Sequence, residues 1–160
     1  MRTHHYQITL RWTGNTGTGT SDYRAYERTH LIAGAGKTLE IPGSSDPAFR
    51  GDATRYNPEE MLLAALASCH MLWFLHLCAA NGVIVEEYTD APEGGMAEDA
   101  RGSGRFTEVT LRPRVVVGTP EMRERVDALH ASAGRYCFIA NSVNFPVRHA
   151  GVTVVIGEQE

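Results

Sequence analysis

Near the start of the chain, apolar and polar side chains alternate with a period of two. Residues 6–12 place Tyr6, Ile8, Leu10 and Trp12 between polar neighbours, which predicts a half-buried strand. Residues 13–22 are rich in Gly, Thr, Asn and Ser and predict a long hairpin tip. Residues 23–32 then return as a second strand, and 38–41 form a short third strand. The loop 42–56 follows.

A long apolar stretch follows that loop and has clear helix boundaries. Asn57 is a suitable N-cap, Pro58 suits the first helical position, and Glu60 completes a capping box. Asn81-Gly82 supplies the stop signal, so the pattern predicts a helix over 58–81. This helix is apolar nearly all round, which predicts a central, buried position.

The same helix has a length that could cross a bilayer, because 61–80 contains no Asp, Glu, Lys or Arg. Ser68, His70 and His76 interrupt the apolar run, and neither end carries the basic flank that orients membrane helices. We therefore expect a buried helix of a soluble protein, with no membrane partner.

The pattern of the remaining half of the chain predicts mostly strands. Its pattern predicts an amphipathic helix over 120–132 and a short helical piece near Tyr136. The predicted strands are 83–88, 107–117 and 152–156, with Pro113 near an edge or a bulge and a Gly-rich acidic turn over 90–104. The order β-β-β-α-β-β-α-β favours a single α+β domain over 1–160 with a mainly antiparallel sheet.

Composition narrows the functional classes. The 160 residues carry 15 Lys and Arg against 19 Asp and Glu, a net charge of −4, with no basic cluster that would indicate nucleic-acid binding. Three cysteines in a chain of this length do not form a secreted disulfide framework, and no signal peptide is visible. The expected compartment is the cytoplasm, where a cysteine is either a small core residue or a reactive thiol.

The three cysteines occupy different settings. Cys69 lies in the middle of the apolar helix, where the helix dipole cannot lower its pKa, so a reactive Cys69 needs a nearby cation from an arginine in a loop. Otherwise it is one more small residue of that helix. Cys78, nine positions on, faces the opposite side and is expected in the core. Cys137 is placed near the start of a helical turn, which favours thiolate, or is simply buried there.

Other chemistries find little support. The seven histidines form no HExxH pattern, and no Gly-rich phosphate loop opens a helix. A zinc site built from distant histidines and a Cys–His dyad remain open, although His70 points about 100° away from Cys69 on the helix. No cofactor and no metal are expected.

The segment Asn57-Pro58-Glu59 followed by an Ala-rich helix with Cys69 ten residues after Glu59 resembles the signature of the OsmC/Ohr family. Cys137 lies 68 residues after Cys69, and the family's second cysteine follows the first by roughly sixty to seventy residues. The resemblance covers essentially the whole chain. It implies an OsmC-like swapped homodimer, with sheets wrapped around the long central helices.

The resemblance also implies roles for individual residues. Cys69 would be the peroxidatic cysteine, and Cys137 the cysteine that resolves its sulfenic acid as a disulfide. Glu59 would hold an arginine over Cys69. Arg50 is the first choice for that arginine, Arg24 the second and Arg55 the third.

The function implied is a thiol-dependent peroxidase that reduces organic hydroperoxides, and hydrogen peroxide as a further substrate, with a small dithiol or a redoxin as reductant. Apolar residues such as Trp73 and Phe74 would favour organic peroxides, or are simply core. Phe138 stands where the family's peroxidases tend to have proline, which indicates a divergent subgroup. Two alternatives stay open: a non-catalytic module that binds a hydrophobic ligand, and another Cys69-dependent transferase.

Overall fold

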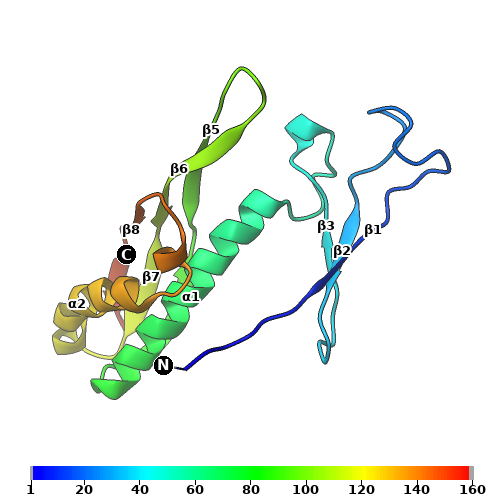
Figure 1. Cartoon of the computed structure of the whole chain (residues 1–160). Helices are drawn as coiled ribbons and strands as arrows, with labels where there is room; N and C mark the ends of the chain where they lie inside the picture. The colour runs from blue at the N-terminus through cyan, green and yellow to red at the C-terminus, as the bar shows by residue number, and fades with distance from the viewer. Residues whose placement is uncertain (1, 159–160) are drawn as a thin grey trace. The chain divides into compact units, whose positions relative to one another are not determined.

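The computed structural model describes residues 2–158 and contains two compact units, Met1–Leu62 and Leu63–Glu160. The first unit holds three strands and a short 3-10 helix (Figure 1). The second unit holds most of the long helix α1, a second helix and six strands. The fold is therefore α+β, as predicted.

A three-stranded antiparallel sheet forms the first unit. β1 (Thr9–Trp12), β2 (His30–Ala33) and β3 (Ile41–Gly43) pair in that order, and η1 (Pro47–Phe49) follows. The three predicted strands exist, with shorter bounds. The expectation that β1 is half-buried is wrong within this chain, because all four of its residues are exposed.

Helix α1 (Pro58–Ala80) begins and ends where the local signals predict. The Asn57 side chain accepts a hydrogen bond from the Glu60 amide at 2.8 Å, and the Glu60 carboxylate accepts one from the Asn57 amide at 3.0 Å. Gly82 adopts a positive φ of 68°, which lets the Val83 amide donate back to the Cys78 carbonyl at 2.9 Å. The capping box and the glycine stop are confirmed.

Only one stripe of α1 is buried in the chain. Leu66, His70, Phe74 and Cys78 are spaced four apart and form that stripe. By length and composition α1 is the one helix of the described residues that could cross a membrane, and 22% of its most apolar window is buried. The prediction of burial on every side is therefore not met within one chain, and Leu72 is 62% exposed.

Two three-stranded sheets form the second unit. One has the order β4-β7-β9 and the other β5-β6-β8, with the last strand of each pairing in parallel and the other pairs antiparallel. The helices that follow β7 are α2 (Pro120–Tyr136) and η2 (Ala140–Ser142). The strands are β4 (Val85–Asp90), β5 (Glu93–Glu98), β6 (Gly104–Leu111), β7 (Pro113–Val117), β8 (Val147–His149) and β9 (Val152–Val155).

Three sequence predictions are corrected here. The strand predicted over 107–117 is two strands in different sheets, separated at Arg112. Pro113 is fully buried and is the first residue of the central strand β7. Proline has no amide N–H, and at the first position of a strand no hydrogen bond from that group is needed. The predicted turn over 90–104 contains β5, and β8 was not predicted.

The core of the second unit lies between α1, α2 and the β4-β7-β9 sheet. Phe74 and Cys78 of α1 meet Val115 and Val117 of β7 there. From α2 come Val126, Leu129 and Ala133, the apolar face of an amphipathic helix. Cys78 is 1% exposed and its pKa is raised to about 11 by burial, so its predicted core position is confirmed.

Candidate active site

The second unit brings two of the three cysteines together. The side chain of Cys69 on α1 lies close enough to that of Cys137 at the end of α2 to shift the pKa of the Cys137 thiol. Cys69 comes three residues after Leu66, a member of the buried stripe of α1. It therefore lies at the margin of the core, and its side chain is partly exposed. The pair therefore joins an accessible thiol to a buried one.

Cys137 closes α2 rather than opening a helix. Its amide donates to the Ala133 carbonyl at 2.9 Å as the C-cap, and its Sγ accepts from the Ala140 amide at 3.4 Å. The predicted helix-start position is wrong, because α2 continues to Tyr136. Burial, followed by the hydrogen bond with Cys69, raises the pKa of Cys137 to about 11. Cys137 is thus held as a neutral thiol.

Three aromatic side chains gather around this pair, and we call them the aromatic group: Trp73, Tyr136 and Phe138. Trp73 lies one helical turn after Cys69, and the other two flank Cys137 in sequence. The Trp73 ring stacks on Tyr136 at 5.1 Å and meets Phe138 edge-on at 5.7 Å. Tyr136 and Phe138 remain 52% and 65% exposed, so an apolar surface lies beside the thiols. Phe74, in contrast, belongs to the core.

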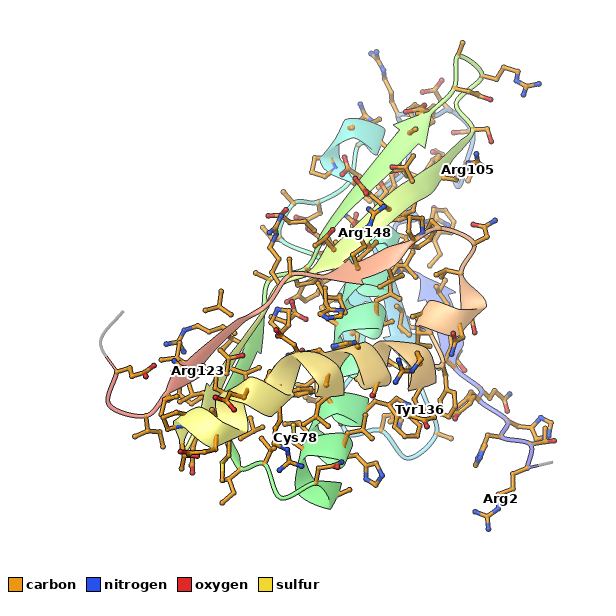
Figure 2. The ribbon with its side chains drawn as sticks, turned by 90° about the vertical axis from the view of Figure 1, so that its left-hand side faces the viewer. Arg2, Cys78, Arg105, Arg123, Tyr136 and Arg148 are labelled. Carbon is orange, nitrogen blue, oxygen red and sulfur yellow. The ribbon has the colours of Figure 1, made fainter. Side chains whose placement is uncertain are left out.

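A cavity of about 450 Å³ reaches Cys137 within the second unit. Its polar lining comes from Arg135, Asn141, Arg148, His70 and His149. Figure 2 shows Arg148 on β8 and Tyr136 at the end of α2. Cys69 is not among the described residues that line this cavity. The remaining lining residues are small or apolar: Leu66, Leu111, Ala131, Gly134, Ala140 and Val147.

Sequence reasoning missed a buried histidine pair beneath this cavity. His70 Nε2 and His130 Nδ1 share a hydrogen bond of 2.9 Å, with the two rings nearly parallel. The His130 ring also stacks on Phe74 at 3.9 Å, and His149 lies 5.5 Å from it. Burial first, then the neighbouring histidines, lowers the pKa of His70 to about 4 and that of His130 to about 3.

Within residues 2–158, no group of three or more His, Cys, Asp or Glu side chains is arranged to hold a metal ion. The position of each histidine in its helix could have indicated that it is buried. His70 has the same spacing of four as Leu66, Phe74 and Cys78 on α1, and His130 adjoins Leu129 on the buried face of α2.

The other predicted site residues belong to the first unit. Glu59 lies in the first turn of α1; ten residues of helix rise about 15 Å, so it cannot touch Cys69 of its own helix. Arg50 is exposed and adopts a φ of 65° as the C-cap of η1. The Arg24 amide donates to Asp22 at 2.8 Å, and Arg55 pairs with Asp52 at 3.3 Å. The prediction that Glu59 holds one of these arginines against Cys69 stays a prediction.

Comparison with known proteins assigns this arrangement to a family. Residues 51–150 match the family model described as OsmC-like protein. A structure of an OsmC-like protein of unknown function from Vibrio cholerae is 30% identical and superposes with a TM-score of 0.83, over 94% of this chain and 100% of that one. The uncharacterised protein YmaD of Bacillus subtilis is 25% identical over 146 residues, 89% of each chain.

A more distant structure carries a functional name. The organic hydroperoxide resistance protein OhrB of Bacillus subtilis is 17% identical and has a TM-score of 0.63, over 91% of this chain and 96% of that one. At this identity the likeness shows the shared fold.

Proposed function

Because this chain belongs to the OsmC-like family, we propose that it is a thiol-dependent peroxidase that reduces organic hydroperoxides through Cys69 and Cys137. The observation that carries the proposal is the proximity of these two thiols, which are 68 residues apart in the sequence. Two cysteines that are close neighbours in the folded chain can form a disulfide with little backbone movement. The third cysteine, Cys78, is enclosed in the core and has no part in the reaction.

The proposed reaction has two steps in the protein. The Cys69 thiolate attacks one peroxide oxygen, the O–O bond breaks, and the released alkoxide takes a proton and leaves as an alcohol. Cys69 is then a sulfenic acid. The Cys137 thiol attacks the Cys69 sulfur, a disulfide forms, and the hydroxyl leaves with the thiol proton as water. An external thiol reductant then returns two electrons to the disulfide.

The neutral state of Cys137 agrees with its role as the resolving cysteine, with Cys69 as the cysteine that attacks the peroxide. The thiolate, not the thiol, attacks a peroxide, and burial holds Cys137 protonated at neutral pH. Cys69 is the partly exposed member of the pair and is the one that a peroxide can reach. Its thiolate requires a cation, and we keep Arg50, then Arg24, as the proposed source, with Glu59 as the carboxylate that holds it.

A second copy of the chain is part of the proposal. Helix α1 carries apolar residues outside its buried stripe, and the first unit exposes apolar side chains on its strands. Examples are Leu72, 62% exposed, Leu10, 59% exposed, and Ile41, 46% exposed. So much apolar surface favours association, and a swapped homodimer would cover α1 and the β1-β2-β3 sheet. Such a dimer, in the cytoplasm, is the state in which we expect activity.

The proposed substrates are organic because of what lies beside the thiols. The aromatic group offers an apolar contact for the organic part of a hydroperoxide. Hydrogen peroxide has no such part, so we expect it to react more slowly.

Peroxide consumption with a dithiol as reductant tests the proposal. The wild-type protein is expected to turn over, Cys69→Ser to be inactive, and Cys78→Ser to be fully active as the matched control. Full activity of Cys69→Ser would overturn the proposal. Activity towards another substrate that needs Cys69 and is independent of Cys137 would instead identify a transferase.

A further inference from the structure

The cavity described above touches one member of the cysteine pair. Cys137 lines it, and Cys69 is not among its described lining residues. In a thiol–disulfide exchange the attacking sulfur, the attacked sulfur and the leaving sulfur lie roughly in line. A thiol that arrives through this cavity would therefore meet Cys137 and displace Cys69.

The lining of the cavity has a definite charge. Arg135 and Arg148 are both exposed and line it, together with Asn141 and His149, and no Asp or Glu is among the described lining residues. Arg148 is ion-paired with Glu108. Arg135 donates to the Ser132 hydroxyl at 3.0 Å and has no acidic partner among residues 2–158. An anionic group would find a guanidinium there.

The carbonyl end of α2 would repel an anion if its carbonyl groups had no hydrogen-bond donors. The Arg135 carbonyl accepts from the Asn141 side chain at 3.0 Å, and the Cys137 carbonyl accepts from the Asn141 amide at 3.0 Å. The Ala133 carbonyl accepts from the Cys137 amide. These bonds occupy the Ala133 and Arg135 carbonyls in the last turn of α2 and the Cys137 carbonyl that follows it, and they reduce the repulsion of a negative ligand.

We propose that this cavity is the access site of the reductant, and that the reductant is a small thiol carrying a carboxylate, which attacks Cys137 and expels Cys69. This inference rests on the proposed function. The incoming thiolate forms a bond to the Cys137 sulfur, the Cys137–Cys69 bond breaks, and Cys69 leaves as a thiolate. A second thiol then attacks the mixed disulfide, releases Cys137, and is itself oxidised.

The direction of this exchange agrees with the burial of Cys137. A thiol with a raised pKa is a poor leaving group, and burial raises the pKa of Cys137 to about 11. Attack at Cys69 would have to expel Cys137 into the core. Attack at Cys137 lets the partly exposed Cys69 leave.

The test uses the full-length protein with its disulfide formed by diamide, so that it is independent of any peroxide. Mercaptoacetate and its uncharged amide, mercaptoacetamide, are compared as reductants. After rapid quenching with an alkylating agent, peptide mass spectrometry locates the mixed disulfide. We expect it on Cys137 with both thiols, and a faster reaction with mercaptoacetate at equal thiolate concentration.

Two variants locate the effect. Arg135→Gln is expected to reduce the advantage of mercaptoacetate over its amide by roughly fivefold, the effect of one partly screened ion pair. Arg125→Gln, an exposed arginine of the same helix, is the matched control and should keep the advantage. Ala131→Phe narrows the cavity and should slow both thiols. If Arg135 served only to complement the end of α2, its variant would change stability and leave the ratio of the two rates unaltered.

Mixed disulfide on Cys69, or an advantage of mercaptoacetate that survives Arg135→Gln, would overturn the inference. Neither result bears on the peroxide reaction, which is measured separately on the reduced protein. If diamide forms no Cys69–Cys137 disulfide, both the inference and the proposed function are wrong.

Discussion

The thiol of Cys69 on α1 lies within interaction range of the thiol of Cys137 at the end of α2, and Cys69 is partly exposed while Cys137 is buried. This contact assigns unequal parts to two cysteines of the same chain. The accessible sulfur can meet a peroxide, and the enclosed sulfur can trap the product. The proposed function depends on this difference in exposure between Cys69 and Cys137.

Removing the trapping sulfur should isolate the first step. Cys137→Ser is expected to consume about one equivalent of organic hydroperoxide and then to stop, because the Cys69 sulfenic acid has no partner thiol. Trapping with dimedone and mass spectrometry of the Cys69 peptide detects this product. Cys78→Ser, at a cysteine of the core, should turn over normally. Continued turnover by Cys137→Ser with a dithiol would show that the protein needs no resolving cysteine.

The aromatic group should set the preference for organic peroxides. Phe138→Ala removes a ring that is 65% exposed and is expected to reduce kcat/KM for cumene hydroperoxide by roughly fivefold, through lost apolar contact. The rate with hydrogen peroxide should change less than about twofold. Ile156→Ala, at an apolar residue with 56% exposure, is the control. Equal losses with both peroxides would remove the aromatic group from the specificity argument.

The buried histidine pair should make stability depend on pH. The folded-state pKa is about 4 for His70 and about 3 for His130, below the unfolded value near 6.5, so the unfolded chain binds more protons across that window. Stability is therefore full above about pH 6.5 and is lost as the pH falls. Between pH 7 and pH 5 the loss is ~2 kcal/mol for each ring.

Urea unfolding at a series of pH values measures this loss. His130→Gln should roughly halve the dependence on pH between 7 and 5, because one of the two rings no longer titrates. His5→Gln, at an exposed histidine, should leave the dependence as it is. A wild-type protein whose stability is constant over this range would contradict the buried neutral pair.

The capping box of α1 gives a purely structural prediction. Asn57→Ala removes the side-chain acceptor of the Glu60 amide and is expected to destabilise the protein by about 1 kcal/mol, lowering Tm by roughly 2–4 °C. Ser68→Ala, an exposed position in the same helix, should stay within about 0.5 kcal/mol of the wild type. Calorimetry on both variants is sufficient to decide.

Local signals predicted the parts of the fold that are determined locally. Asn57, Pro58 and Glu60 gave the start of α1, and Gly82 gave its end, because each acts on backbone groups within a few residues. The corner at Arg112 and the strand β5 were missed. The Arg112 amide bonds to Asp90, 22 residues away, and a Cβ on Gly94 in β5 would meet Leu63 at 2.8 Å, so both depend on tertiary neighbours.

The same distinction applies to the candidate site. The spacing of Glu59, Cys69 and Cys137 is visible in the sequence through its resemblance to a family, and the fold does bring the two cysteines close together. The helix-start position of Cys137 was wrong because the pattern ended α2 at residue 132, four residues before its observed end at Tyr136. The pair of His70 and His130 joins residues sixty positions apart, for which a single sequence carries no pairing signal.

Peptide mass spectrometry of the protein after one equivalent of an organic hydroperoxide tests the central claim most directly. The account predicts one intramolecular disulfide, between Cys69 and Cys137, with Cys78 still reduced. A protein whose Cys69 passes to sulfinic acid while Cys137 stays a free thiol, or whose disulfide includes Cys78, would contradict it.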